Sequence, residues 1–137
     1  MFENPTPEQC CALLKGVKNI AVVGLSPNPA RPSYGVAKAL QGWGFSIIPV
    51  HPAVKEVLGV KAYPRLADIP VAIDLVDVFR RAEFIDGIVD DCLALKLKFL
   101  WIQEGIVNGP AASKAREAGM TVVMDRCIYR DYRSFCI

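Results

Sequence analysis

Only one histidine, His51, occurs in the 137 residues of this chain, so any chemistry that needs two or more histidines is excluded. The chain also has no large excess of charge, because 16 Lys and Arg residues nearly balance 14 Asp and Glu residues and leave a net charge of +2. Binding along a nucleic-acid backbone needs a concentrated basic surface, so we expect no nucleic-acid partner. A patch for one small anion remains compatible with this composition.

Long apolar runs are missing as well. No segment approaches the ~18 consecutive apolar residues that would cross a bilayer. The first nine residues, MFENPTPEQ, have neither the basic nor the apolar region of a secretory signal. We therefore predict a cytoplasmic protein with no membrane partner.

The five cysteines include no Cys-x-x-Cys pair, and their number is odd. This pattern predicts reduced thiols rather than a disulfide framework, and it indicates no zinc site. Cys127 follows Asp125 and Arg126, and a positive neighbour can activate a thiol. The favoured interpretation of Cys127 is nevertheless a buried small residue at a strand end, with a reactive thiol as the alternative.

Apolar runs rich in β-branched residues alternate with segments of helical spacing. The runs predict strands at residues 20–24, 45–50, 72–78, 99–103 and 121–124, with a short additional strand near 60–63. Helical patterns occupy the stretches before and between most of these runs. Thr6 and Gln9 have the spacing of a capping box, and Asn108 precedes the last of these helices.

Strands that alternate with helices predict βαβ units and a parallel sheet. We expect an α/β, three-layer Rossmann-like fold with about five strands, helices on both faces and one domain over residues 1–137. Ligands of such sheets bind at the carboxyl ends of the strands. The loops after Val23, Val50, Val78 and Gln103 should therefore face one crevice.

The loop after the first strand, residues 24–35, has contents that suit a phosphate. It is not a Gly-x-Gly-x-x-Gly turn, because the motif positions hold Gly24, Ser26 and Pro29. Gly24 permits close approach to the backbone, Ser26 and Ser33 offer hydroxyls, and Arg31 can donate to phosphate oxygens. The alternative is a proline-stiffened surface loop capped by Ser33, but the position at the first βα turn favours phosphate binding.

The end of the second strand distinguishes among nucleotides. An NAD site usually places an acidic residue there to bind the ribose 2′-hydroxyl. Here the strand ends on Val50, His51 and Pro52, and Lys55 follows before the first acid, Glu56. His51 and Lys55 favour an extra phosphate near the ribose, which points to NADP or coenzyme A (CoA) rather than NAD.

Five motifs occur in order along the chain: Gly-x-Ser-x-x-x-x-Arg-x-Ser at 24–33, Pro-Val-His-Pro at 49–52, Asp-Val-Phe-Arg at 77–80, Trp-Ile-Gln-Glu-Gly at 101–105 and Val-Met-Asp-Arg-Cys at 123–127. Together they resemble the small stand-alone CoA-binding domain proteins. Those proteins are similar to the nucleotide-binding domain of the succinyl-CoA synthetase α-subunit and of ADP-forming acyl-CoA synthetases. The resemblance covers residues 17–127.

The resemblance implies a CoA or acyl-CoA site built from three strand ends. The first loop would hold the CoA phosphates, the second strand end would border the adenosine with Lys55 at the 3′-phosphate, and the nucleotide or pantetheine arm would pass the third. The residues at these places are Gly24, Leu25, Ser26, Arg31 and Ser33; Val50, His51, Pro52 and Lys55; and Val78, Phe79 and Arg80. Two residues depart from the family pattern: His51 stands where Asn is common, and Glu104 adds a negative charge near the fourth loop.

The leading hypothesis is a protein that binds CoA or an acyl-CoA without catalysis of its own and without a metal. The alternatives are an NAD(P)-binding redox sensor and an acyl-transfer or redox enzyme that uses Cys127. The basic and aromatic tail after Cys127 has three interpretations: it stacks on a nucleotide, joins a homodimer or covers the last strand. A homodimer and an unidentified protein partner both stay open.

Overall fold

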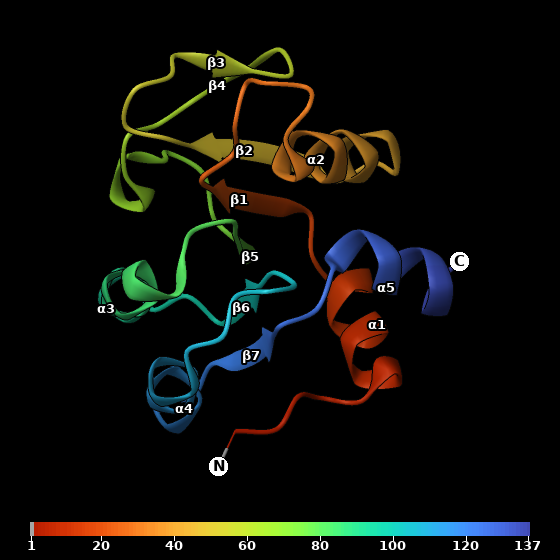
Figure 1. The fold of residues 1–137 in the computed structure, drawn as a ribbon, viewed down its shortest axis with the longest axis vertical. Helices are drawn as coiled ribbons and strands as arrows, with labels where there is room; N and C mark the ends of the chain where they lie inside the picture. The colour runs from red at the N-terminus through yellow and green to blue at the C-terminus, as the bar shows by residue number, and fades with distance from the viewer. Residues whose placement is uncertain (1) are drawn as a thin grey trace.

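Five parallel strands form the central sheet in the computed structural model, which describes residues 2–137. Their order across the sheet is β2-β1-β5-β6-β7, as Figure 1 shows. The bounds are β1 (Asn19–Val23), β2 (Ser46–Val50), β5 (Leu75–Val78), β6 (Phe99–Ile102) and β7 (Thr121–Met124). The predicted α/β fold with a mainly parallel sheet is confirmed.

Helices cover both faces of the sheet (Figure 1). One face carries α1 (Pro7–Lys15), α2 (Pro32–Gly42) and α5 (Ile128–Phe135), and the other carries α3 (Ile85–Ala94) and α4 (Gly109–Glu117). No helix within residues 2–137 is both long enough and apolar enough to cross a membrane. Short elements complete the chain: β3 (Glu56–Val57), β4 (Val60–Lys61), and the 3₁₀ turns η1 (Leu66–Asp68) and η2 (Ala82–Phe84).

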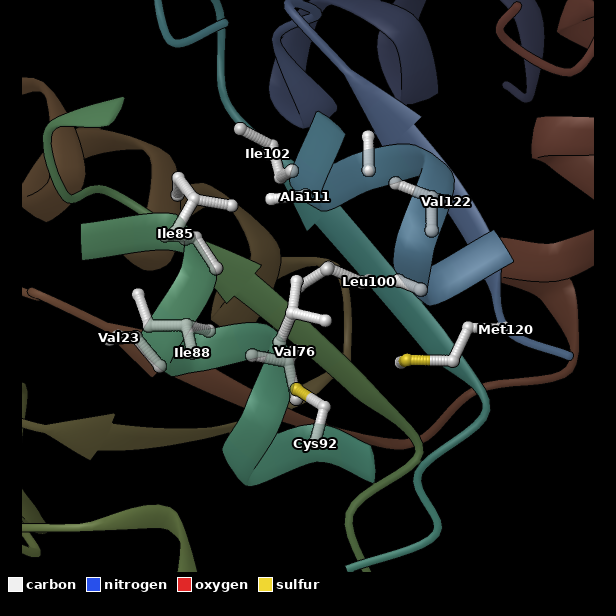
Figure 2. Packing of buried hydrophobic residues seen from close by; sticks show 14 of the residues in the cluster. Val23, Val76, Ile85, Ile88, Cys92, Leu100, Ile102, Ala111, Met120 and Val122 are labelled. Atoms are coloured by element: carbon white, nitrogen blue, oxygen red, sulfur yellow. The ribbon is translucent and has the colours of Figure 1, made fainter. Parts of the chain in front are cut away.

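The continuous apolar strands are explained by burial on both faces. Successive side chains point to opposite sides of a strand, so each central strand contributes to two cores. In β1, Ile20 and Val22 pack under α1 and α2, whereas Ala21 and Val23 pack toward α3 and α4. Figure 2 shows the second of these cores, in which Ile85 of α3 approaches the strand side chains.

The predicted helix starts are present. The Thr6 hydroxyl accepts a hydrogen bond from the Gln9 backbone N–H, and the Gln9 side chain accepts one from the Thr6 N–H, which completes the capping box of α1. The Asn108 side chain accepts from the Ala111 N–H and caps α4 in the same manner.

Two predicted strands differ from the structure by more than one residue, whereas the bounds of the others agree to within one. The strand expected at 72–78 begins only at Leu75, because Asp74 turns its carboxylate to accept the backbone N–H groups of Lys18 and Asn19, at 3.0 and 2.8 Å. The short strand expected near residues 60–63 is β4, which pairs with β3 as a two-stranded antiparallel ribbon outside the main sheet. Neither change moves a carboxyl end of the main sheet.

The C-terminal tail is a helix, α5, packed beside α1 and α2. The Tyr132 ring lies 4.9 Å from Trp43 and 5.4 Å from Phe45, centroid to centroid. Ile128 is fully buried in the core on the same face of the sheet. The tail therefore extends one helical layer of the fold.

The prediction that all five cysteines are reduced is wrong for two of them. Cys11 in α1 and Cys136 at the end of α5 form a disulfide between positions 125 residues apart. The fold brings α1 and α5 together because both cover the same face of the sheet, and the spacing of the cysteines in the sequence does not indicate this. Cys10, Cys92 and Cys127 are free thiols.

Candidate functional site

A cavity of about 630 Å³ opens at the carboxyl ends of the strands. The strand order reverses between β1 and β5, so the loops that follow these two strands diverge and leave a crevice between them. Segments that follow all five parallel strands line this strand-end cavity. One or more residues from each are Gly24 and Ser26, His51, Phe79 and Arg80, Gln103, and Cys127.

The structure brings most of the predicted site residues together in this cavity. Those that line it are Gly24, Ser26, Arg31, Ser33, His51, Phe79 and Arg80. They come from three different strand ends, as the parallel topology requires. Their contact with a ligand stays a prediction.

The other five predicted residues do not line the cavity. Leu25, Val50 and Val78 are buried in the two cores. Pro52 and Lys55 are exposed on the loop that leads from β2 to β3. Apolar residues at a strand end thus belong to the packing that holds the loops in place.

Gly24 is required by the close approach of two loops. Its φ is +85°, and a Cβ placed on it would lie 2.6 Å from the Phe79 carbonyl oxygen and 3.0 Å from the Arg80 Cδ. Any other side chain at position 24 would push the loop after β1 away from the loop after β5. The glycine therefore sets the spacing of the two loops at the point where the strand order reverses.

Hydrogen bonds within the first loop hold its polar groups in place. The Ser33 hydroxyl accepts from the Ser26 backbone N–H at 3.0 Å, and the Ser26 hydroxyl accepts from the Asn28 N–H at 3.1 Å. Because each hydroxyl oxygen accepts from the backbone, its own O–H remains available to donate. Both hydroxyls can therefore donate to an anion in the cavity.

Arginine side chains surround the same hydroxyls. Arg31 is exposed at the N-cap of α2 and makes no side-chain cap bond. Arg80 lies over the Phe84 ring, with its guanidinium carbon 4.1 Å from the ring centroid, and this contact limits the orientations of its charge. Arg81 is more exposed and pairs with Glu83 at 3.2 Å. The cavity mouth is consequently cationic on the side of the first and third strand ends.

The negative charge of Glu104 at the cavity is compensated by a neighbouring arginine. Its carboxylate pairs with the Arg130 guanidinium of α5 across the far side of the cavity. The hydrogen bond from Arg130 to Glu104 and the charge of that carboxylate raise the pKa of Arg130. The repulsion expected from Glu104 is therefore neutralised by a residue that the sequence prediction did not include.

The start of α5 is fixed by polar contacts beneath it. The Arg126 guanidinium donates twice to the Asp131 carboxylate, with both distances 2.7 Å. The Trp101 indole Nε1 donates to the Arg126 carbonyl at 2.9 Å. These contacts hold Cys127 and Arg130 at the cavity wall.

A buried carboxyl lies below the cavity. Asp77 in β5 is fully buried, and its Oδ1 accepts from Gln103 Nε2 at 2.6 Å. Within residues 2–137 its Oδ2 has no hydrogen-bond partner. Burial raises the pKa of Asp77 to about 7, and the bond from Gln103 opposes part of that rise. Gln103 also lines the cavity, so this carboxyl is connected to the cavity by one side chain.

Eight cavity residues are absent from the predicted site. They are Pro32, Val36, Arg81, Gln103, Glu104, Ile106, Cys127 and Arg130. Cys127 is partly exposed here, contrary to the favoured interpretation of a buried residue. The signal for Gln103 and Cys127 was present in the sequence, since each closely follows a strand whose end must face the crevice. No pattern in the sequence predicted that Arg130 lies beside Glu104.

Comparisons with known proteins show the family and the fold to which the chain is similar. Residues 18–133 match the family model described as "CoA binding domain". YneT, a Bacillus subtilis protein described as uncharacterized, is 44% identical over 127 residues, which is 93% of this chain and 94% of that protein. A solved structure of a hypothetical protein from Pyrococcus horikoshii OT3 superposes with a TM-score of 0.91 at 36% identity, covering 98% of this chain and 99% of that chain.

The chain is also similar, at a greater distance, to part of an ADP-forming ligase subunit. The alpha subunit of ADP-forming acetate–CoA ligase II from Pyrococcus furiosus is 34% identical over 76 residues, which cover 55% of this chain. The aligned part spans only 17% of that subunit. The similarity is therefore to one part of the ligase subunit.

Proposed function

The chain belongs to the CoA-binding domain family, and on this basis we propose that its strand-end cavity binds CoA or an acyl-CoA without catalysing a reaction. The resemblance recognised from the five sequence motifs is confirmed by the family match. The observation that carries the proposal is the convergence of Ser26, Ser33 and Arg31 with Arg80 on a single cavity. These groups have the chemistry that phosphate oxygens require, namely hydroxyl donors and planar guanidinium donors.

The first loop would take the diphosphate of CoA. Ser26 and Ser33 present free O–H groups, and Arg31 supplies a charge that is not used for capping α2. In the first turn of α2, Pro32 has no N–H and the Tyr34 N–H donates to the Arg31 carbonyl at 3.1 Å, so the Ser33 N–H is the backbone group that would donate to an anion there.

The end of β2 would border the adenosine. His51 Nδ1 accepts from the Ala53 backbone N–H at 3.1 Å, so in the neutral ring Nε2 carries the proton and acts as a donor. No carboxylate stands there to bind a ribose 2′-hydroxyl, which disfavours NAD. Lys55 lies exposed on the following loop, and its long side chain would reach the 3′-phosphate from outside the cavity.

Binding without catalysis is supported by the lack, within the described residues, of a general base hydrogen-bonded to the Cys127 thiol. Within the described residues, Cys127 makes no side-chain hydrogen bond, and His51 Nδ1 is occupied by the backbone. A nucleophile within reach of a general base is the usual signature of covalent catalysis. The cytoplasmic location, the lack of a nucleic-acid partner and the homodimer stay predictions.

Calorimetric titration with CoA, dephospho-CoA, NAD and NADP tests the proposal. We expect CoA to bind, and we expect dephospho-CoA to bind about tenfold or more weakly because it lacks one charge-assisted phosphate contact. NAD should not bind measurably. Binding of a dinucleotide without binding of CoA would overturn the proposal and favour the NAD(P) sensor.

A second candidate function follows from the position of Cys127. Because this thiol lies partly exposed in the cavity wall, an acyl-transfer or redox step on bound CoA is the competing hypothesis. Its rate of alkylation against pH distinguishes the two. A thiol that reacts only above about pH 8.5 is not activated and supports binding alone, whereas fast reaction near neutral pH supports the enzyme.

A further inference from the structure

A second hollow, here called the helix groove, lies between α2 and the first turn of α5. It is an open groove of about 630 Å³. Its lining residues are Pro32, Gly35, Val36, Lys38, Ala39 and Tyr129. Pro32 and Val36 also line the strand-end cavity, so the two hollows meet at these side chains.

Apart from the exposed Lys38, the groove has apolar and rigid walls. On α2, Gly35 and Ala39 contribute little or no side chain, and Val36 contributes an aliphatic one. Opposite them, the Tyr129 ring is stacked on Trp43 with a centroid distance of 5.4 Å and an interplanar angle of 17°. Arg133 Nη1 also donates to the Tyr129 hydroxyl at 3.3 Å. A ring held at its face and at its hydroxyl forms a fixed wall.

We propose that the helix groove binds the aliphatic acyl chain of an acyl-CoA whose CoA part occupies the strand-end cavity. This inference rests on the proposed function and makes it more specific, because it names an acyl-CoA rather than free CoA as the preferred ligand. The polar groups lie in the cavity, and the groove continues from it with apolar walls. A ligand that fills both the cavity and the groove must carry its charged groups in the cavity and an apolar chain beyond Pro32 and Val36.

The connection lies between α2, which supplies Pro32 and Val36, and the part of the cavity wall that Cys127 and Arg130 form at the start of α5. The phosphate donors stand at the ends of β1 and β5, and His51 marks the adenosine side at the end of β2. The rest of the wall is formed by Gln103, Glu104 and Ile106 after β6 and by Cys127 and Arg130, which lie two positions before and one position after Tyr129 of the groove. The arm of CoA would thus lead toward α5 and the groove. A saturated chain entering there loses no hydrogen bonds and removes apolar surface from water.

Gly35 offers a direct way to close the groove. A Cβ at this position meets no atom within 4 Å, and Gly35 does not line the strand-end cavity. Gly35→Leu should therefore fill the groove without backbone strain. Gly87→Leu is the matched control, because Gly87 is also an exposed helical glycine with free space around it but lies on α3, on the opposite face.

The experiment compares dissociation constants for CoA, acetyl-CoA, butanoyl-CoA and hexanoyl-CoA by calorimetry. A fully buried methylene strengthens binding about fourfold, and in an open groove we expect about twofold for each. Hexanoyl-CoA should thus bind at least about tenfold more tightly than acetyl-CoA. Gly35→Leu should remove this dependence and keep free CoA within about twofold of wild type, whereas Gly87→Leu should behave as wild type.

Other results would overturn the inference in distinguishable ways. Equal affinity for CoA and hexanoyl-CoA refutes the acyl groove and leaves the proposed function intact. A chain-length dependence that persists in Gly35→Leu places the acyl group elsewhere. If Gly35→Leu instead changes the mass in sedimentation and leaves the chain-length dependence intact, the groove is an interface between copies of the chain. If neither CoA nor any acyl-CoA binds, the proposed function fails together with the inference.

Discussion

The Cα of Gly24 faces the carbonyl of Phe79 so closely that a Cβ on Gly24 would lie 2.6 Å from the Phe79 oxygen. The two residues follow β1 and β5, neighbouring strands between which the strand order reverses. The Phe79 N–H also donates to the Val23 carbonyl at 2.8 Å, which holds the two loops in register. The site is thus built on a backbone contact that only glycine allows.

Gly24→Ala should therefore damage both stability and binding. We expect the free energy of unfolding to fall by about 1–3 kcal/mol, because alanine must adopt φ of +85° and because its Cβ forces the loops apart. Urea unfolding measures this loss, and titration with CoA should show weaker binding. Gly35→Ala is the control, since its Cβ has open space and α2 should be unchanged or slightly more stable. Equal stability of wild type and Gly24→Ala would contradict this role of Gly24.

Arg31→Ala should weaken CoA binding without affecting the fold. Its side chain caps nothing in α2, so little stability is at risk. Loss of one charge-assisted bond to a phosphate costs about 1.5–3 kcal/mol, or about 10- to 150-fold in the dissociation constant. Arg65→Ala is a suitable control because Arg65 is exposed, pairs with Asp68 and lies outside the cavity. An unchanged affinity of Arg31→Ala would remove Arg31 from the site.

Asp77 should make the folded protein less stable as the pH rises, which is the opposite of the effect of an aspartate whose pKa is lowered by folding. Burial raises its pKa from 3.8 to about 7, so between these values the folded state binds a proton that the unfolded state has lost. The free energy of unfolding should therefore fall as the pH rises through this window, by on the order of 4 kcal/mol. Urea unfolding at about pH 5 and pH 8 measures the part of this fall that lies above pH 5, which is about 2.7 kcal/mol.

The contribution of Asp77 is isolated by substitution. Asp77→Asn keeps an acceptor for Gln103 and cannot ionise, so its stability should vary less between the two pH values than that of wild type. Asp90→Asn removes an exposed carboxylate that pairs with Lys114 and should leave the wild-type pH dependence in place. The same slope in Asp77→Asn and wild type would show that Asp77 does not titrate as the structure indicates.

The disulfide between Cys11 and Cys136 should be detectable by counting thiols. Unfolded protein without reductant should expose three thiols, and reduced protein should expose five. Cys136→Ser should lower the free energy of unfolding by about 2–5 kcal/mol, because the bond closes a long loop in the unfolded chain. Cys127→Ser removes a free thiol and should leave stability nearly unchanged. Five reactive thiols in the absence of reductant would contradict the bond.

The parts of the fold that follow from local patterns were predictable. The run Ile20–Val23 is apolar at every position because both faces of β1 are covered, and such runs identify buried parallel strands directly. Parallel strands bring their carboxyl ends to one edge, so Ser26, His51 and Phe79 could be assigned to one crevice from the sequence alone. The motifs then identified the family to which the chain belongs.

The parts that depend on long-range packing were not predictable. Arg130 reaches Glu104 because α5 lies against α2, and the packing of this tail was undecided from its sequence. Cys11 and Cys136 meet for the same reason. Val78 was assigned to the site by its place in a motif, although its side chain points into the core beside α3. A motif shows where a strand ends. The alternation of side chains along the strand then decides which of them point toward the cavity and which toward the core.

The most direct test of the central claim is a map of backbone amide chemical shifts during titration with CoA. The largest changes should fall on the segments that line the strand-end cavity, namely residues 24–33, 51, 79–81, 103–106, 127 and 130. A third hollow of about 660 Å³ lies at the edge of β7, where Asn4, Thr6 and Val122 line it. Saturable shifts confined to the strand-end cavity would support the account. Shifts that gather instead around the third hollow, or no shifts at all at saturating CoA, would contradict it.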